Sequence, residues 1–157
     1  MSETLYETDF YAWTQEQARA LRERAGRDNA LDYEHLAEEV GDLGESQRRA
    51  CLSQIRNILL HLLKIEYVGP LEAVDHWRQE IVGFRGELED ETSPTLQRRL
   101  TDEYRGEYGK VLKRLRLTLE VQGRRVDLPL DCPYSWDDVT GRGANWTPEP
   151  RYADPPG

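Results

Sequence analysis

Apolar side chains recur at helical spacing along most of this chain, and that spacing limits the possible folds more than any other feature. Between residues 71 and 90 the gaps alternate between three and four residues, at Val74, Trp77, Ile81, Phe84 and Leu88. Such alternation places the side chains on one face of an α-helix, as in the seam of a helical bundle. A second helix is predicted from Ser93, as its N-cap, and Pro94, in its first position, to Gly123.

Three further helices are predicted upstream, over residues 9–26, 33–44 and 46–67. Gly26 and Gly44 are the expected ends of the first two, and "VGP" at residues 68–70 stops the third. Glycine inside a helix costs about 1 kcal/mol relative to alanine, so interior glycines need a reason. Close approach of the last two predicted helices would explain four of them, which are Gly83, Gly86, Gly106 and Gly109.

The tail after residue 123 has a different composition, because it holds six of the eight prolines. One short helical turn is predicted there, beginning at Ser135. The sequence therefore predicts an all-α fold, a single bundle of about five helices with a Pro-rich, loop-like C-terminal tail. We expect one helical domain over residues 1–147, with residues 124–147 packed on the bundle, and disorder over residues 148–157.

Composition points away from membranes and from the secretory route. No apolar run approaches the roughly 20 residues that span a bilayer, and the acidic, polar start "MSETLYETDF" is unlike a secretory signal. The two cysteines, Cys51 and Cys132, lack zinc-type spacing, so reduced thiols are predicted. We therefore expect a soluble, cytoplasmic protein without a membrane partner.

Charge is unevenly distributed along the chain. The net charge of −9 argues against nucleic-acid binding driven by bulk charge, yet residues 98–125 hold nine Lys and Arg against four Asp and Glu. A solvated helix face that balances the acidic remainder explains this stretch. A site for an acidic partner or for RNA is the alternative.

Several separate stretches resemble a known family. They are "LYETDFYAWTQEQARALR", "LDYEHLAEEVGDLGESQRR", "LLHLLKIEY", "SPTL" and "DCPYSWDDV", which together cover about residues 5–149. They resemble a bacterial family catalogued as domain of unknown function 29. The resemblance implies an all-helical, bacterial, cytoplasmic protein, and it implies neither an activity nor a catalytic residue. Glu38, Glu39, His61 and Lys64 fall on the family's recognisable motif.

Polar residues within the apolar stretch "IRNILLHLLKIEY", residues 55–67, are the best candidates for a site. On a helical wheel Asn57, His61 and Lys64 lie together, away from the core face. In the preceding predicted helix, Glu39 points towards the edge of the core, where a carboxylate needs a partner. The sequence therefore predicts a binding site that contains Glu39, Asn57, His61 and Lys64.

Three interpretations of this site remain open. Glu39 can pair with His61, with Lys64 or with an arginine of the next predicted helix, Arg78 or Arg85, and simply fix the helix register. Glu39 and His61 can instead ligate a divalent metal ion, as carboxylates and histidines do in helical bundles. Arg56 and His61 can also be catalytic, because "RNILLH" resembles the Arg–His motif of the HEPN helical ribonucleases. There, arginine would hold the phosphate and histidine would transfer protons.

We expect a binding or interaction module whose partner is another protein or a second copy, with no established activity. A HEPN-like ribonuclease or a metal-dependent hydrolase centred on His61 is the alternative. The first interpretation predicts a shielded His61 with one protein partner. The alternative predicts His61 beside a cleft or a dimer interface, with Arg56 or Glu39 within reach.

Overall fold

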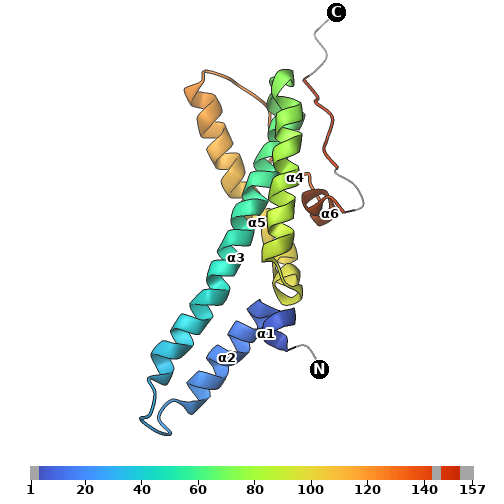
Figure 1. The fold of residues 1–157 in the computed structure, drawn as a ribbon. Coiled ribbons are helices and arrows are strands. Elements are labelled where there is room, and N and C mark those ends of the chain that lie inside the picture. Colours follow the sequence, from blue (N-terminus) through green and yellow to red (C-terminus); the bar gives the residue numbers. More distant parts are fainter. Residues whose placement is uncertain (1–3, 143–145, 153–157) are drawn as a thin grey trace, which may run out of the picture.

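The computed structural model describes residues 4–142 and 146–152 of the 157-residue chain, and within them the fold is all-helical, without strands (Figure 1). Its helices are α1 (Leu5–Thr8), α2 (Phe10–Arg24), α3 (Tyr33–Leu63), α4 (Val74–Glu91), α5 (Pro94–Val121) and α6 (Trp136–Thr140). A π-helical turn (Lys64–Val68) extends α3, and a 3-10 turn (Leu71–Ala73) precedes α4. The predicted all-α fold is confirmed.

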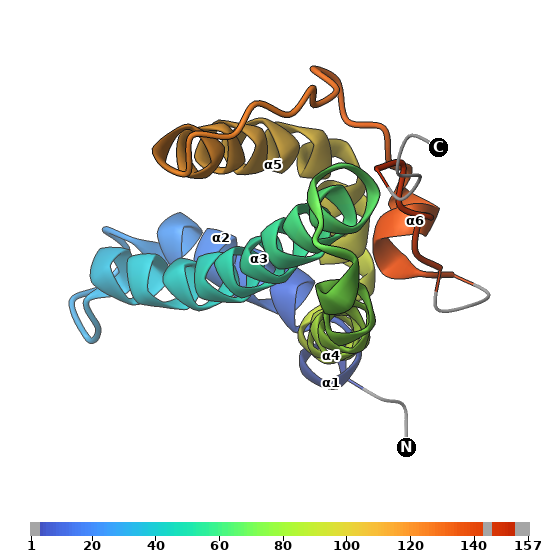
Figure 2. The same cartoon turned by 90° about the horizontal axis from the view of Figure 1, so that it is seen from above.

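The second half of α3 forms the centre of the bundle, between α4 and α5 (Figure 2). Its core residues are fully buried, at Ile55, Ile58, Leu59, Leu62 and Leu63. Burial of each such side chain contributes roughly 1.5–3 kcal/mol relative to exposure. The apolar stripe predicted for α4 also faces the core, since Ile81 and Leu88 are buried and Trp77 and Phe84 pack against the core.

The helix boundary expected at Gly44 is wrong, because α3 runs through this residue without interruption. A Cβ atom at Gly44 would lie 2.3 Å from Oγ1 of Thr14 on α2. Glycine is therefore required here for the close approach of α2 to α3, and the helix continues through it. The start of α3 is as predicted, with a side-chain oxygen of Asp32 accepting a hydrogen bond from the backbone N–H of His35.

The four interior glycines of α4 and α5 do not mark a close contact between these helices. A Cβ atom added at Gly83, Gly86, Gly106 or Gly109 would meet no heavy atom within 4 Å. The expectation of tight packing there is therefore wrong. These four glycines lie on open faces of their helices, where a larger side chain would also fit.

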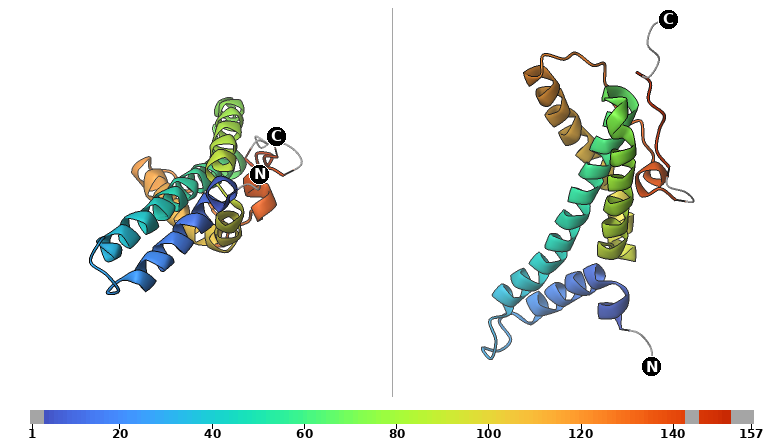
Figure 3. Two further views of the ribbon diagram at one scale, coloured as in Figure 1. Left: turned by 60° about the horizontal axis from the view of Figure 1, so that its bottom comes forward. Right: turned by 45° about the horizontal axis from the view of Figure 1, so that its top comes forward.

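The first half of α3 projects beyond α4 with α2 alongside it (Figures 1 and 3). We call α2 together with residues 33–47 of α3 the arm. Small residues of α3 face α2, and Ala37 and Gly44 are buried there. The larger apolar residues of this stretch lie at the surface, since Leu36 is 38% exposed and Leu43 is 52% exposed.

The tail returns across the bundle after α5. The hydroxyl groups of Tyr104 and Tyr108 donate hydrogen bonds to the backbone oxygens of Tyr134 and Pro129, respectively. Near the end, the backbone N–H of Arg151 donates to the Glu66 carbonyl oxygen at 2.8 Å. Residues 153–157 lie outside the described residues, so the disorder expected over residues 148–157 stays a prediction.

Candidate functional site

The structure does not bring Glu39 and His61 together. Both lie on one continuous helix, α3, where a rise of about 1.5 Å per residue places them roughly 33 Å apart. Glu39 is also exposed, away from the core edge where the sequence placed it. A pair or a shared metal ion is therefore excluded within one chain. In residues 4–142 and 146–152, no group of three His, Cys, Asp or Glu side chains is placed to hold a metal ion.

His61 is buried and pairs with Glu80 of α4. Its Nδ1–H donates to the backbone oxygen of Asn57 at 2.9 Å, and its Nε2–H donates to a carboxylate oxygen of Glu80. The hydrogen bond from His61 holds the pKa of Glu80 below its usual value, so this carboxyl group is ionised. Both ring nitrogens of His61 therefore face oxygen atoms.

The surroundings of His61 leave it little open space. The edges of its ring meet Phe84 and Trp77, with centroids 5.1 and 6.5 Å away. Nζ of Lys64 lies 5.6 Å from the centroid of the Trp77 ring. Asn57 contributes its backbone oxygen. This arrangement matches a shielded histidine that joins α3 to α4, with Glu80 as a partner that the sequence analysis missed.

Arg56 faces a different neighbour from His61. Its Nη1 donates at 2.8 Å to Glu107, a buried carboxylate on α5 that also accepts from Lys110 at 3.1 Å. Burial alone would raise the pKa of Glu107, but its hydrogen bonds to Arg56 and Lys110 outweigh burial and lower it. Within one chain, Arg56 and His61 do not converge on a common point. The ribonuclease interpretation would need a second chain, and it stays a prediction.

The His61–Glu80 pair makes stability depend on acid pH. A carboxyl group whose pKa is depressed by folding stabilises the fold above its unfolded pKa, near 4.5, and this contribution is lost as pH falls through the folded value. Because the Glu80 side chain is 37% exposed, solvent screening limits the effect to about 0.5 kcal/mol. Urea unfolding from about pH 6 to pH 3 should therefore show a smaller loss of stability for Glu80→Gln than for wild type.

Glu87→Gln on the same helix is the control for this experiment, because the partner of Glu87 is the uncharged Gln54. We expect Glu87→Gln to follow wild type. Identical pH profiles for Glu80→Gln and wild type would contradict an ionised Glu80 that is bonded to His61.

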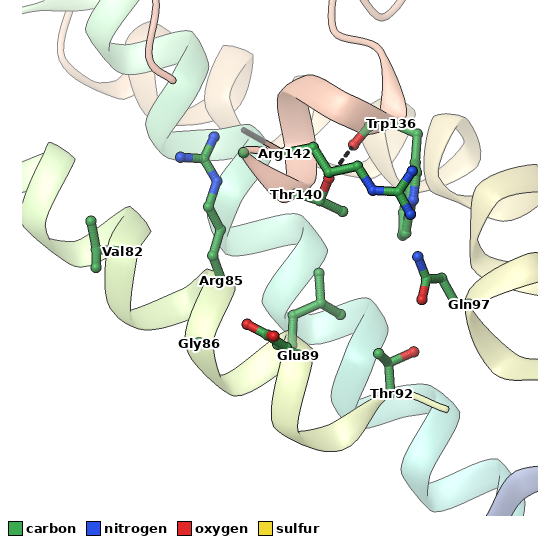
Figure 4. A pocket seen from close by; sticks show the side chains of 11 residues that line it. Val82, Arg85, Gly86, Glu89, Thr92, Gln97, Trp136, Thr140 and Arg142 are labelled. Atoms are coloured by element: carbon green, nitrogen blue, oxygen red, sulfur yellow. Dashed lines mark hydrogen bonds between the residues drawn. The ribbon is translucent and has the colours of Figure 1, made fainter. Parts of the chain in front are cut away.

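A cleft of about 610 Å³ opens elsewhere, between α4, the start of α5 and α6 (Figure 4). The side chains that matter for its chemistry are Val82, Arg85, Thr92, Gln97, Trp136 and Arg142. None of the sequence-predicted site residues lines it. The sequence analysis considered Arg85 only as a partner for Glu39.

Arg85 is the unusual residue of this cleft, because its side chain is buried without a carboxylate partner among the described residues. The residue is only 8% exposed. Nε donates to the backbone oxygen of Val139 at 3.0 Å, and Nη2 donates to those of Asp138 and Trp146, each at 2.7 Å. Nη1 has no hydrogen-bond partner. Burial lowers the pKa of Arg85, and the charge of the nearby Asp138 opposes this shift only in part.

The guanidinium group of Arg85 packs against the end of α6. Gly141 follows α6 at φ +68°, and a Cβ atom there would lie 2.9 Å from Nη1 of Arg85, so only glycine fits. Thr92 adds a second buried atom without a partner, its Oγ1. Figure 4 shows the Arg142 side chain beside Trp136, across the opening from Arg85 and Glu89.

A second buried charge ties the tail to the bundle. Glu66, in the π-helical turn, accepts hydrogen bonds from the Tyr134 hydroxyl at 2.9 Å and from Nε of Arg151 at 2.6 Å. Burial and the neighbouring Glu66 carboxylate raise the pKa of Tyr134. The stretches "LLHLLKIEY" and "DCPYSWDDV" thus meet at this contact. Both carboxylate oxygens of Glu66 are already paired, which suits a structural role.

Comparisons with known proteins support the fold and leave the activity open. A family model described as "Domain of unknown function DUF29" matches residues 5–143. An alpha-helical protein of unknown function from Rhodospirillum rubrum has a similar solved structure, with a TM-score of 0.74 and 26% sequence identity over 90% of this chain and 92% of that one. No curated protein matches the chain. Within the described ranges, none of the helices has the length and apolar character that crossing a membrane requires.

Proposed function

Because this chain belongs to DUF29, a family described as a domain of unknown function, we propose its role from its own side chains: it is a binding module that holds a small organic acid in the Arg85 cleft. One observation carries the proposal. The buried guanidinium of Arg85 has an N–H group without a partner, and among the described residues no carboxylate forms a hydrogen bond with it.

A buried charge without a counter-charge is costly, and a bound anion removes that cost. The three acceptors of Arg85 are neutral backbone carbonyl groups, which compensate a cation only in part. A carboxylate bound in the cleft would place the missing negative charge close to the guanidinium group, whose Nε and Nη2 are already bonded to backbone oxygens. Arg142 at the rim adds a second positive charge.

The other walls indicate the body of the ligand. Trp136, Val82 and Leu88 offer apolar surface, and a volume of about 610 Å³ lies in the range of small-molecule sites. Glu89 also lines the cleft and would repel a second negative charge. These features favour a monocarboxylic acid with a flat, apolar body.

The proposed location is the cytoplasm. Cys51 and Cys132 are free thiols, which fits a reducing compartment. Burial raises the pKa of Cys51 to about 11, so this thiol stays protonated and inert.

Calorimetric titration with benzoate, with its neutral analogue benzamide and with inorganic phosphate tests the proposal. We expect benzoate to bind at least about tenfold more tightly than benzamide, a difference of about 1.4 kcal/mol. Arg85→Met should abolish this preference, because it replaces the aliphatic part of the arginine side chain and removes the charge. Stronger binding of phosphate than of benzoate would contradict the apolar body of the proposed ligand.

Arg78→Met is the matched control. Arg78 lies on the same helix and also contacts the tail, through Thr147, but it does not line the cleft. It should bind benzoate as wild type does. Because Arg85→Met also removes bonds to α6, Arg142→Gln at the exposed rim is the second variant, with an expected several-fold loss of affinity. Equal benzoate affinity in wild type, Arg85→Met and Arg142→Gln would refute the proposal.

A further inference from the structure

The arm carries an apolar stripe that the described part of the chain leaves uncovered. Leu36, Val40 and Leu43 follow one another at spacings of four and three residues and so share one face of α3. The same face carries Gln47, whose Nε2 donates to the backbone oxygen of Glu91, the last residue of α4, at 2.6 Å. The stripe therefore lies on the same face of α3 that α4 packs against, in the part of α3 that α4 does not reach.

The charged residues beside this stripe determine which kind of surface can pack on it. Residues 33–47 of α3 contain five carboxylates and neither Lys nor Arg; the acidic residues are Glu34, Glu38, Glu39, Asp42 and Glu45. A helix with exposed apolar residues and basic neighbours would complement this surface in both shape and charge.

Such a helix exists in this chain, at the far end of α5. Leu117 is 53% exposed and Val121 is 89% exposed, and their spacing of four residues places them on one face. Lys110 and Arg114 precede them at the same helical spacing. Residues 110–121 hold four basic residues against one acidic residue, Glu120. The surface of α5 is thus the apolar, basic counterpart of residues 33–47 of α3.

We propose that two copies of the chain associate reciprocally, with the outer face of α5 in each copy docked on the arm stripe of the other. The arm and the far end of α5 project in different directions from the central crossing of the helices (Figures 1 and 3). A twofold rotation can therefore exchange them and form both contacts at once. Each stripe alone is small, and the reciprocal arrangement buries two pairs of stripes in one dimer. This inference is independent of the Arg85 cleft.

Sedimentation velocity across the micromolar range tests the association. We expect a dimer at about 0.02 M salt and a larger dissociation constant at about 0.5 M salt, because screening weakens the charge complementarity. Leu43→Glu and Leu117→Glu should each sediment as monomers, and both positions are exposed, so the fold is retained. A wild-type monomer at both salt concentrations would overturn the proposal and leave the stripes to unlike partners.

Disulfide trapping identifies which surfaces meet. Leu43→Cys mixed with Leu117→Cys should form a cross-linked dimer under mild oxidation, and neither variant should do so alone. The wild-type chain, with Cys51 buried and Cys132 half-buried, is the control for background cross-linking. Cross-linking of Leu43→Cys alone would show contact between two arms and would overturn the reciprocal arrangement.

Discussion

Replacing Gly44 by alanine is expected to lower the free energy of unfolding by about 2–3 kcal/mol, because the added methyl group overpacks the interface of α2 and α3. The new Cβ atom would lie 2.3 Å from Oγ1 and 3.3 Å from Cβ of Thr14. Thr14 cannot turn away easily, since it is fully buried and its hydroxyl group donates to the backbone oxygen of Tyr11 at 2.7 Å. The two helices must therefore separate.

Gly41→Ala is the matched control for this measurement. A Cβ atom at Gly41 would meet only Cβ of Ala18, at an ordinary distance of 4.0 Å. Alanine is the better helix former, so this change should be neutral or should stabilise the protein by up to about 1 kcal/mol. The measurement is the free energy of unfolding of both variants in urea, compared with that of wild type. If Gly44→Ala proved as stable as Gly41→Ala, the close contact of α2 with α3 would be wrong.

Arg56→Ala is expected to cost about 2 kcal/mol at neutral pH, because it leaves the buried carboxylate of Glu107 with Lys110 as its remaining partner. This cost depends on pH. Arg56 helps to hold the pKa of Glu107 low, so the stabilisation is present above the unfolded pKa of Glu107, near 4.5, and is lost as pH falls through the folded value. The difference between wild type and Arg56→Ala should therefore shrink in acid.

The measurement is urea unfolding at about pH 7 and about pH 3, with Arg49→Ala, at an exposed position of the same helix, as the control. Arg49→Ala should change stability by less than about 0.5 kcal/mol at both pH values. A deficit for Arg56→Ala that stays constant down to pH 3 would exclude the ionised Glu107 as its cause.

The helices of this protein were largely predictable from the sequence, because their signals are local. Pro94 after Ser93 marks the start of α5, and the alternating apolar spacing of α4 marks its buried face. Gly44 shows where local signals fail. A glycine that ends a helix and one that admits a neighbouring helix are the same in sequence, and the deciding contact, Thr14, lies thirty positions away.

The candidate site was less predictable, because it depends on how helices are placed against one another. The shielding of His61 and its single charged partner fit the structural interpretation. The partner is Glu80, which the sequence did not indicate, because the register of α4 on α3 cannot be deduced from either helix alone. Leu36 and Leu43 follow core spacing but are exposed, because α4 ends before it reaches them. That Arg85 lacks a charged partner among the described residues could not be predicted from the sequence either, because it depends on where α6 packs.

The most direct test of the central claim, that the Arg85 cleft binds a small organic acid, is a two-dimensional ¹H–¹⁵N spectrum of the whole chain during titration with benzoate. The Nε–H signal of Arg85 and the indole N–H signal of Trp136 report the cleft from two walls. The proposal predicts that both signals shift and saturate together, and that benzamide leaves them in place. Shifts confined to other residues, or equal shifts with benzoate and benzamide, would contradict it.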